Sequence, residues 1–170
     1  AQIVELLASL CEERDTAIVL ITHDLALLAG FAERILVMYA GSIVEQGPVD
    51  TIYYGATHPY TWGLMESVTR PDEHRRRRLS PIRGTPPSAL AIPPGCPFHP
   101  RCPHAEEVCV EEVPALVTRP AGLGVAPSGA GHIIDHPSAC HFAGELPRPD
   151  RLRDLAQRGG PGGGDASPRT

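Results

Sequence analysis

The stretch "TAIVLITHDLALLAGFAERILVMYAGSIVEQG" (residues 16–47) decides the fold that the sequence predicts. It opens with a continuous β-branched apolar run, which is typical of a strand buried on both faces of a parallel sheet. Residues 24–33 follow at once and predict a helix with Asp24 near its start. The rest of the stretch predicts a β-hairpin that turns around Ala40 and Gly41.

The sequence on either side of this stretch predicts three more helices. Residues 3–14 place Ile3, Leu6, Leu7 and Leu10 on one stripe at helical spacing. Pro48 begins a short predicted helix, and residues 58–68 predict another with Pro59 at its first position. Helix, buried strand, helix and hairpin together indicate the α/β class, at the C-terminal end of a sheet-based domain.

Composition divides the remainder of the chain. Regular periodicity fades after residue 68, and the basic run Arg75–Arg78 is expected to be a solvated face or a linker. The tail "RGGPGGGDASPRT" (residues 158–170) holds too little apolar surface to fold. The predicted organisation is a sheet-based part, a helix with its linker, a cysteine-rich extension and a disordered tail, over residues 1–57, 58–92, 93–145 and 146–170.

The charge and hydropathy of the chain argue against binding to nucleic acid and against a membrane-spanning helix. The formal net charge of −5 over 170 residues leaves no basic footprint for nucleic acid. No apolar run approaches the roughly 20 residues that a membrane-spanning helix needs. The chain is therefore expected in the cytosol, where thiols stay reduced and clustered cysteines bind metal more often than they form disulfides.

Four of the five cysteines lie in the extension and are candidate metal ligands: Cys96, Cys102, Cys109 and Cys140. The first three stand in "PPGCPFHPRCPHAEEVC" (residues 93–109), where prolines favour the repeated turns that converging thiolates need. A segment with so small an apolar core also needs a crosslink to be ordered. Cys11 lies on the first predicted helix and is expected to be an ordinary thiol.

The cysteine spacing leaves two kinds of metal centre open. Structural zinc sites usually separate neighbouring cysteines by about two to four residues, whereas five and six residues separate the first three here. Iron–sulfur clusters are held by four thiolates with more varied spacing. An iron–sulfur cluster is therefore the first hypothesis and Zn²⁺ the alternative. Three nearby histidines are expected to be surface or supporting groups: His99, His104 and His141.

His23 stands at the C-terminal end of the predicted buried strand. Ligands of open parallel sheets bind outside the carboxyl ends of the strands. A neutral imidazole there can contact a phosphate oxygen or a positioned water, or it can cap the strand end structurally. Position alone does not decide between the two.

Residues 18–68 resemble the C-terminal part of the ATP-binding subunits of ABC transporters, and among these the oligopeptide/dipeptide importers. "THDL" (residues 22–25) resembles the switch-histidine motif, and "ILVMYAGSIVEQGP" (35–48) resembles the hairpin that follows it. "HPYTWGLMESV" (58–68) and "PPGCPFHPRCPHAEEVCVEEVPAL" (93–116) resemble the extension that marks peptide importers. The resemblance covers roughly residues 1–145.

This resemblance implies roles for the candidate residues. His23 would be the switch histidine, a catalytic and nucleotide-binding residue that contacts the γ-phosphate and the attacking water when two ATPase domains close. Asp24 would be a helix-cap residue. The four extension cysteines would hold a four-iron four-sulfur (4Fe–4S) cluster, with Zn²⁺ as the alternative. ATP and Mg²⁺ would be bound mainly by residues upstream of this sequence.

The resemblance also implies partners and a location. These are a second ATP-binding subunit, transmembrane permease subunits and, indirectly, a peptide-binding protein, at the cytoplasmic face of a bacterial membrane. The sequence holds no lysine and so no phosphate-binding loop, and this portion alone is expected to be inactive as an ATPase. The alternative function is a stand-alone regulatory or interaction domain that binds a metal or an iron–sulfur cluster.

Overall fold

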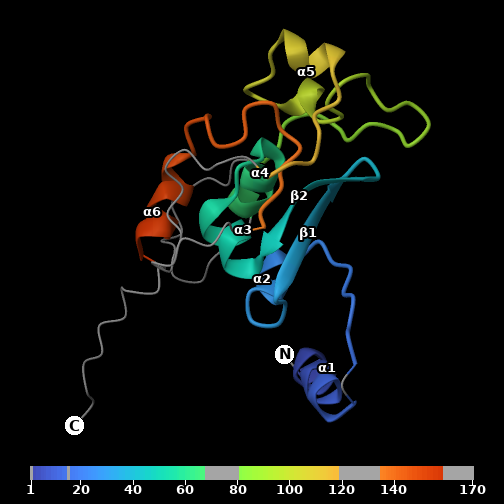
Figure 1. Cartoon of the computed structure of the whole chain (residues 1–170), viewed down its shortest axis with the longest axis vertical. Helices are drawn as coiled ribbons and strands as arrows, with labels where there is room; N and C mark the ends of the chain where they lie inside the picture. Colours follow the sequence, from blue (N-terminus) through green and yellow to red (C-terminus); the bar gives the residue numbers. More distant parts are fainter. Residues whose placement is uncertain (1, 15, 68–80, 119–134, 159–170) are drawn as a thin grey trace.

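The computed structural model describes residues 2–14, 16–67, 81–118 and 135–158. Figure 1 shows the order of the elements along the chain. They are α1 (Gln2–Arg14), α2 (Leu25–Leu28), β1 (Arg34–Tyr39), β2 (Ser42–Pro48), α3 (Val49–Gly55), α4 (Pro59–Ser67), the 3₁₀ turn η1 (His99–Arg101), α5 (Glu107–Glu111) and α6 (Asp150–Arg158). None of these helices is long and apolar enough to cross a membrane. The basic run Arg75–Arg78 lies outside the described residues.

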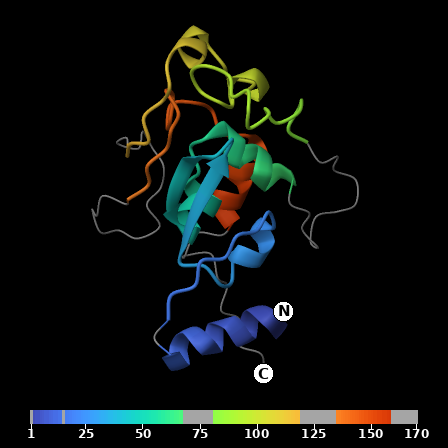
Figure 2. The ribbon, with the colours of Figure 1, turned by 90° about the vertical axis from the view of Figure 1, so that its right-hand side faces the viewer.

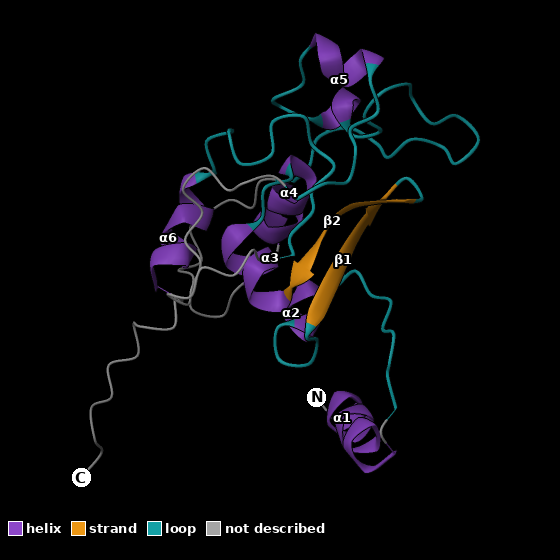
Figure 3. Ribbon diagram, in the orientation of Figure 1, coloured by secondary structure: helices purple, strands orange, loops and turns teal. Residues whose placement is uncertain are grey.

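The β1–β2 hairpin is the centre of the structure (Figure 3). Its strands pair antiparallel from Arg34 opposite Pro48 to Tyr39 opposite Ser42. The turn residues Ala40 and Gly41 have φ values of 48° and 83°, and positive φ at both positions matches the right-handed twist of the strands. The predicted hairpin and its turn are therefore confirmed.

One hydrophobic core joins the hairpin to the cysteine-rich extension. Ile35, Val37 and Tyr39 alternate along β1 with exposed residues, so one face of the strand is buried. They pack in one cluster with Phe98 and with the other members Val44, Ile52, Cys96 and Cys109. The extension is thus fixed to the hairpin by shared apolar burial.

A second core lies beside the first and is built by helices. Trp62 and Met65 of α4 pack there with Leu152 of α6, together with Leu25 and Ala56. The indole N–H of Trp62 donates to the Ala56 carbonyl at 2.7 Å. Figures 1 and 2 show α3, α4 and α6 grouped beside the hairpin, with α1 at one end of the molecule and α5 at the other.

The chain returns to the hairpin after residue 134 and covers the free edge of β2. The Gln46 N–H donates to the Pro137 carbonyl at 3.0 Å, and the Ala139 N–H donates to the Val44 carbonyl at 2.7 Å. Ser138 pairs on its other side with Val117. Residues 137–139 therefore lie between β2 and a second part of the extension, and the strand edge is not left open.

A buried carboxylate reinforces this contact. Oε1 of Glu45, in β2, accepts hydrogen bonds from the backbone N–H and hydroxyl of Thr57 at 2.6 and 2.9 Å, from the His58 N–H at 3.2 Å and from Nε2 of His136 at 2.9 Å. Burial alone would raise the pKa of Glu45, but the hydrogen bond and the charge of His136 outweigh it and lower the pKa below 4.5. The guanidinium of Arg148 also acts on this carboxylate through its charge.

Two expectations from the sequence differ from the structure. Residues 16–22 are extended but form no strand, and Val19 and Ile21 are 90% and 93% exposed. A strand needs at least one neighbouring strand to pair with, and the only sheet among the described residues is the β1–β2 hairpin. The helix expected over 24–33 is shorter than predicted, since only Leu25–Leu28 is helical.

The third difference concerns the expected tail. Composition predicted irregular chain from residue 146 onward, yet Asp150–Arg158 forms α6. Leu152 is completely buried against the α4 core, and this burial outweighs the polar character of the helix. Residues 159–170 lie outside the described residues.

Replacing Glu45 with glutamine should destabilise the chain by about 2 kcal/mol at neutral pH, because charged hydrogen bonds to several donors are lost. The pKa of Glu45 is lower in the folded protein than its ordinary value of 4.5. Its stabilising contribution is therefore present above that value and is lost as the pH falls through the lowered folded value. Urea unfolding of the two proteins between about pH 7 and pH 3 should show a difference that shrinks with acidification. A difference independent of pH would contradict this assignment.

Candidate metal centre

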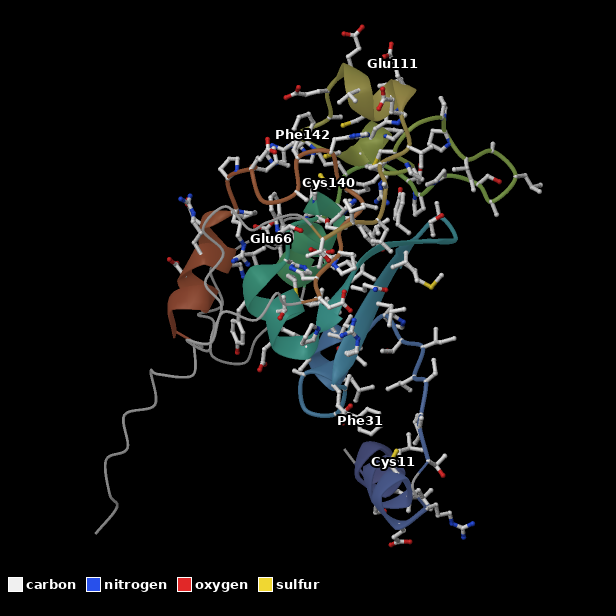
Figure 4. All side chains as sticks on the ribbon, viewed as in Figure 1. Cys11, Phe31, Glu66, Glu111, Cys140 and Phe142 are labelled. Carbon is white, nitrogen blue, oxygen red and sulfur yellow. The ribbon has the colours of Figure 1, made fainter. Side chains whose placement is uncertain are left out.

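The four extension cysteines line one cavity of about 20 Å³. Cys96 lies just before η1, Cys102 just after it, Cys109 within α5 and Cys140 directly after the edge segment 137–139. Figure 4 places Cys140 in the same part of the molecule as Phe142 and Glu111, and Cys11 on α1 at the opposite end. The remaining lining residues are His58, Pro59, Phe98, His99, His104, His141 and Phe142.

Tight backbone turns bring the first three cysteines to this cavity. The Cys96 N–H donates to the Cys109 carbonyl at 2.8 Å, so two loops meet directly at the site. The His99 N–H donates to the Cys96 carbonyl and the Cys102 N–H to the His99 carbonyl, which closes the chain around η1. The prolines between the cysteines fix φ and favour these turns.

Gly95 makes the meeting of the two loops possible. Its φ of 66° is in the left-handed region, and a Cβ there would lie 2.4 Å from the Cys109 carbonyl oxygen and 2.6 Å from the Val110 carbonyl carbon. Backbone atoms cannot move aside as a flexible side chain can. Glycine is therefore required at position 95 by both conformation and space.

Arg101 ties the preceding linker to the same region. Its Nε donates to the Arg83 carbonyl at 2.8 Å, and Nη2 donates to the carbonyls of Gly84 and Ile82 at 3.1 and 3.3 Å. Its guanidinium also lies 5.9 Å from the centre of the Tyr39 ring. One side chain thus joins the linker, η1 and the hairpin.

The thiols are free, and none forms a disulfide. Burial raises the pKa of Cys96, and it raises the pKa values of Cys102 and Cys140 to about 11, with neighbouring thiols adding to the effect. Protonated thiols are what an apolar cavity without a cation favours. Binding of a metal ion or cluster to these thiols would therefore release protons.

The donor chemistry fits a thiolate-held centre, but the spacing of the side chains does not fit a single ion. Within the described residues, no three His, Cys, Asp or Glu side chains are grouped closely enough to hold one metal ion. A tetrahedral zinc site would need all four sulfurs at about 2.3 Å from one point. The four cysteines nevertheless line one cavity, and thiolates are the donors of both zinc sites and iron–sulfur clusters.

The three histidines that stand beside the cysteines, His99, His104 and His141, contact the protein through one ring nitrogen or through the ring itself. Nδ1 of His99 lies 3.0 Å from the Cys96 carbonyl oxygen, and Nε2 of His141 lies 3.0 Å from that of Glu112. The His104 ring stands edge-on to Trp62, with 6.0 Å between ring centres.

His58 is a residue of this site that the sequence did not single out. It is 1% exposed and lines the cavity beside the cysteines. Burial lowers its pKa to about 4, although the Glu45 charge and a hydrogen bond to the Ala139 backbone oppose the shift. The only available signal was its place directly before Pro59, where a helix-capping side chain is expected.

His23 lies apart from the cysteines. It occupies an exposed bend between the extended residues 16–22 and α2, and it is not among the residues that line the cavity. The Thr22 hydroxyl accepts a hydrogen bond from the Asp24 N–H at 3.0 Å and shapes this bend. The predicted catalytic residue and the predicted metal ligands therefore belong to separate places in the chain.

Replacing Gly95 with alanine should destabilise the protein by about 2 kcal/mol or more, because alanine disfavours a positive φ and the new Cβ would meet backbone atoms. Urea unfolding measures the loss, and iodoacetamide labelling should show faster modification of Cys96 and Cys109. Gly30→Ala is the matched control, since nothing lies within 4 Å of its Cβ position. Equal stability of the two variants would show that the loops do not need to meet.

Comparison with known proteins places the described features in a family. Residues 44–109 match the family model described as the oligopeptide/dipeptide transporter C-terminal region. The chain is 46% identical over 123 residues to the oligopeptide transport ATP-binding protein OppD of Salmonella typhimurium, covering 72% of this chain and 36% of that protein. It is 45% identical over 119 residues to the dipeptide transport ATP-binding protein DppD of Bacillus subtilis, covering 70% and 35%.

A mycobacterial relative extends the match further along this chain. The oligopeptide transport ATP-binding protein OppD of Mycobacterium tuberculosis is 44% identical over 140 residues, which is 82% of this chain and 21% of that protein. The chain thus spans about a third or less of the length of these relatives. The resemblance seen in the sequence is confirmed: the chain is similar to the ATP-binding proteins of oligopeptide and dipeptide transport, and its residues 44–109 match the C-terminal region of the oligopeptide/dipeptide transporter family.

Proposed function

We propose that this chain is the C-terminal part of the ATP-hydrolysing subunit of an ABC importer that drives uptake of dipeptides or oligopeptides. The observation that carries the proposal is the family match over residues 44–109, together with relatives named as ATP-binding proteins of peptide transport. The whole subunit would act at the cytoplasmic face of the membrane as a peripheral protein. It would work with permease subunits, a second ATP-binding subunit and, indirectly, a peptide-binding protein.

The exposed segment 16–22 supports a larger ATPase domain over a stand-alone regulatory domain. Val19 and Ile21 are almost fully exposed. Apolar side chains that remain in water contribute no hydrophobic stabilisation. Burial between neighbouring strands of a parallel sheet would account for it. A stand-alone domain would provide no neighbouring strands to bury this segment.

His23 is the residue to which we assign the switch role. Its place at the end of the apolar segment, in an exposed bend before α2, leaves its ring accessible to a nucleotide. A neutral imidazole there can accept a proton from, or donate one to, the attacking water and the γ-phosphate oxygens. Phosphoryl transfer depends mainly on such positioning and charge stabilisation. ATP and Mg²⁺ would be held mainly by other residues of the full subunit.

The four cysteines are proposed to hold a 4Fe–4S cluster, with Zn²⁺ as the alternative. Support comes from four free thiols around one cavity with apolar surroundings, and from the spacing of the cysteines along the sequence. When bound, such a cluster would crosslink four points of the chain and make the crosslink sensitive to oxidants. No redox partner is needed for this structural or regulatory role.

Anaerobically purified protein should contain about four iron and four sulfide per chain, with broad absorbance near about 400 nm. Serine at any one of the four positions Cys96, Cys102, Cys109 and Cys140 should remove most of the iron. Cys11→Ser is the matched control and should leave the iron content unchanged, because Cys11 lies on α1 far from the cavity. A colourless protein with about one zinc would establish the alternative, and a protein with neither would reject a metal centre.

The switch role of His23 is tested in the full-length subunit assembled with its permeases. His23→Ala should lower the rate of ATP hydrolysis by about 10²-fold or more, the usual size of one proton-transferring group. The affinity for ATP should change little, which equilibrium binding of a fluorescent ATP analogue measures. His104→Ala is the control, since its ring lies at the cysteine cavity. An unchanged rate of ATP hydrolysis in His23→Ala would contradict the proposed switch role of His23.

A further inference from the structure

The edge segment 137–139 pairs with β2 in one register. Ser138 lies opposite Glu45 in an antiparallel bridge, and backbone hydrogen bonds of 3.0 and 2.7 Å flank this pair on either side. Side chains directly opposite each other in such a pair lie on the same face of the sheet and close together. Glu45 and Ser138 are 0% and 1% exposed, so this face of the pairing is completely buried.

His136 continues this register beyond the bridge. Two residues back from Ser138 and two residues forward from Glu45, the register places His136 opposite Gly47. The structure agrees, because a Cβ on Gly47 would lie 3.3 Å from Cδ2 of His136. Since Gly47 has no side chain, the imidazole lies over this position and its Nε2 reaches Oε1 of Glu45 at 2.9 Å. His136 is therefore fitted to β2 both by shape and by a hydrogen bond.

The face that holds the His136 ring adjoins the cysteine cavity. Side chains two residues apart in an extended chain share a face, and His136, Ser138 and Cys140 stand at alternate positions. The carboxylate of Glu45 also accepts the His58 N–H at 3.2 Å. Because His58 and Cys140 line the same cavity, Glu45 connects the His136 ring to the wall of the site.

Side chains, and not backbone groups, distinguish one register of this segment from another. A slip by one residue would turn every side chain of the segment to the opposite face, and Cys140 would turn away from the cavity. The hydrogen bond from His136 to the buried Glu45 favours the observed register. The neighbouring ion pair between Arg34 and Asp135, at 2.9 Å, has side chains that are 45% and 65% exposed, and such a pair contributes little.

We infer that His136 is a positioning residue for the cysteine centre: by binding Glu45 across Gly47, it sets the register of residues 137–139 and so brings the Cys140 thiol to the cavity. The inference rests on the proposed function only where it concerns metal, because the register is a property of the chain itself. His136 acts through the backbone of the edge segment and is not among the residues that line the cavity.

Three substitutions test this role by the reactivity of the thiols. His136→Ala removes the ring, whereas His136→Gln keeps an N–H donor that can reach Glu45. Asp135→Asn is the matched control, because it removes the exposed ion pair of the neighbouring residue. Each protein is prepared anaerobically with a chelator and without metal, and is then labelled with iodoacetamide. Peptide mass spectrometry gives the modification rate of each cysteine.

Cys140 in His136→Ala should be alkylated about tenfold faster than in the wild type, as the loss of one hydrogen bond to a carboxylate allows. Cys96 is the internal control, because it is buried to a similar extent, 8% exposed against 9%, but lies on another segment. Its rate should change much less. His136→Gln should restore most of the protection of Cys140, and Asp135→Asn should behave as the wild type.

Two results would overturn the inference. Equal acceleration of Cys140 and Cys96 would indicate a general loss of stability, and an unchanged rate at Cys140 would show that the backbone pairing alone sets the register. If His136→Ala does not fold, Gly47→Ala decides, since its Cβ would meet the His136 ring while every hydrogen-bonding side chain is kept. Cys140 should again react faster than Cys96 relative to the wild type, and equal rates to the wild type would overturn the inference.

The proposed metal centre is tested separately on the same wild-type protein. Metal analysis after anaerobic reconstitution with iron and sulfide, or with zinc, shows whether the four cysteines hold either. A wild type that takes up neither would reject the metal centre, while the alkylation rates of the metal-free proteins would still decide the role of His136.

Discussion

The backbone pairing between β2 and residues 137–139 is the contact on which the rest of the described structure depends. Two N–H groups, from Gln46 and Ala139, close this pairing across the edge of the hairpin. The same segment carries His136 to the buried Glu45 and places Cys140 at the cavity. Without the pairing, the segment that carries the fourth cysteine would be held only by its contacts with Val117 and Glu112 of the extension.

The cysteines belong to the hydrophobic core as well as to a candidate site. Cys96 and Cys109 pack with the hairpin residues Val37 and Tyr39 in one cluster. A thiol is a small apolar group when protonated and a charged ligand when it is not. The same side chains can therefore fill the core without metal and bind metal when protons leave, so occupancy and folding stability are linked.

The sequence predicted the features that depend on near neighbours. The hairpin followed from alternation and from the Ala40–Gly41 turn, and the helix starts followed from Pro48 and Pro59, because these signals act within a few residues. The sequence also identified the four cysteines as one set, since clustered thiols in a proline-rich segment have few other uses. Their common cavity agrees with that hypothesis.

The features that the sequence did not predict depend on distant parts of the chain. The local pattern gives no sign that Glu45 is buried, and its carboxylate is bound by His136 and Thr57, which lie far from it along the chain. The α6 helix forms because Leu152 meets the core of α4, whatever its polar composition. The failure of residues 16–22 to form a strand has the same cause, because strand pairing is decided by neighbours in space.

The bridge between Val117 and Ser138 has a consequence for how this chain can vary in length. The two residues are adjacent in space, so the chain between them begins and ends at one place. The entropy of closing such a loop rises only by about 0.6 kcal/mol for each doubling of its length. A change of length before His136 and Pro137, which contact β2, is therefore inexpensive, whereas the intervals from Cys96 to Cys102 and from Cys102 to Cys109 contain η1 and α5. Of the three intervals between the cysteines, the last is the one whose length can change without altering η1 or α5.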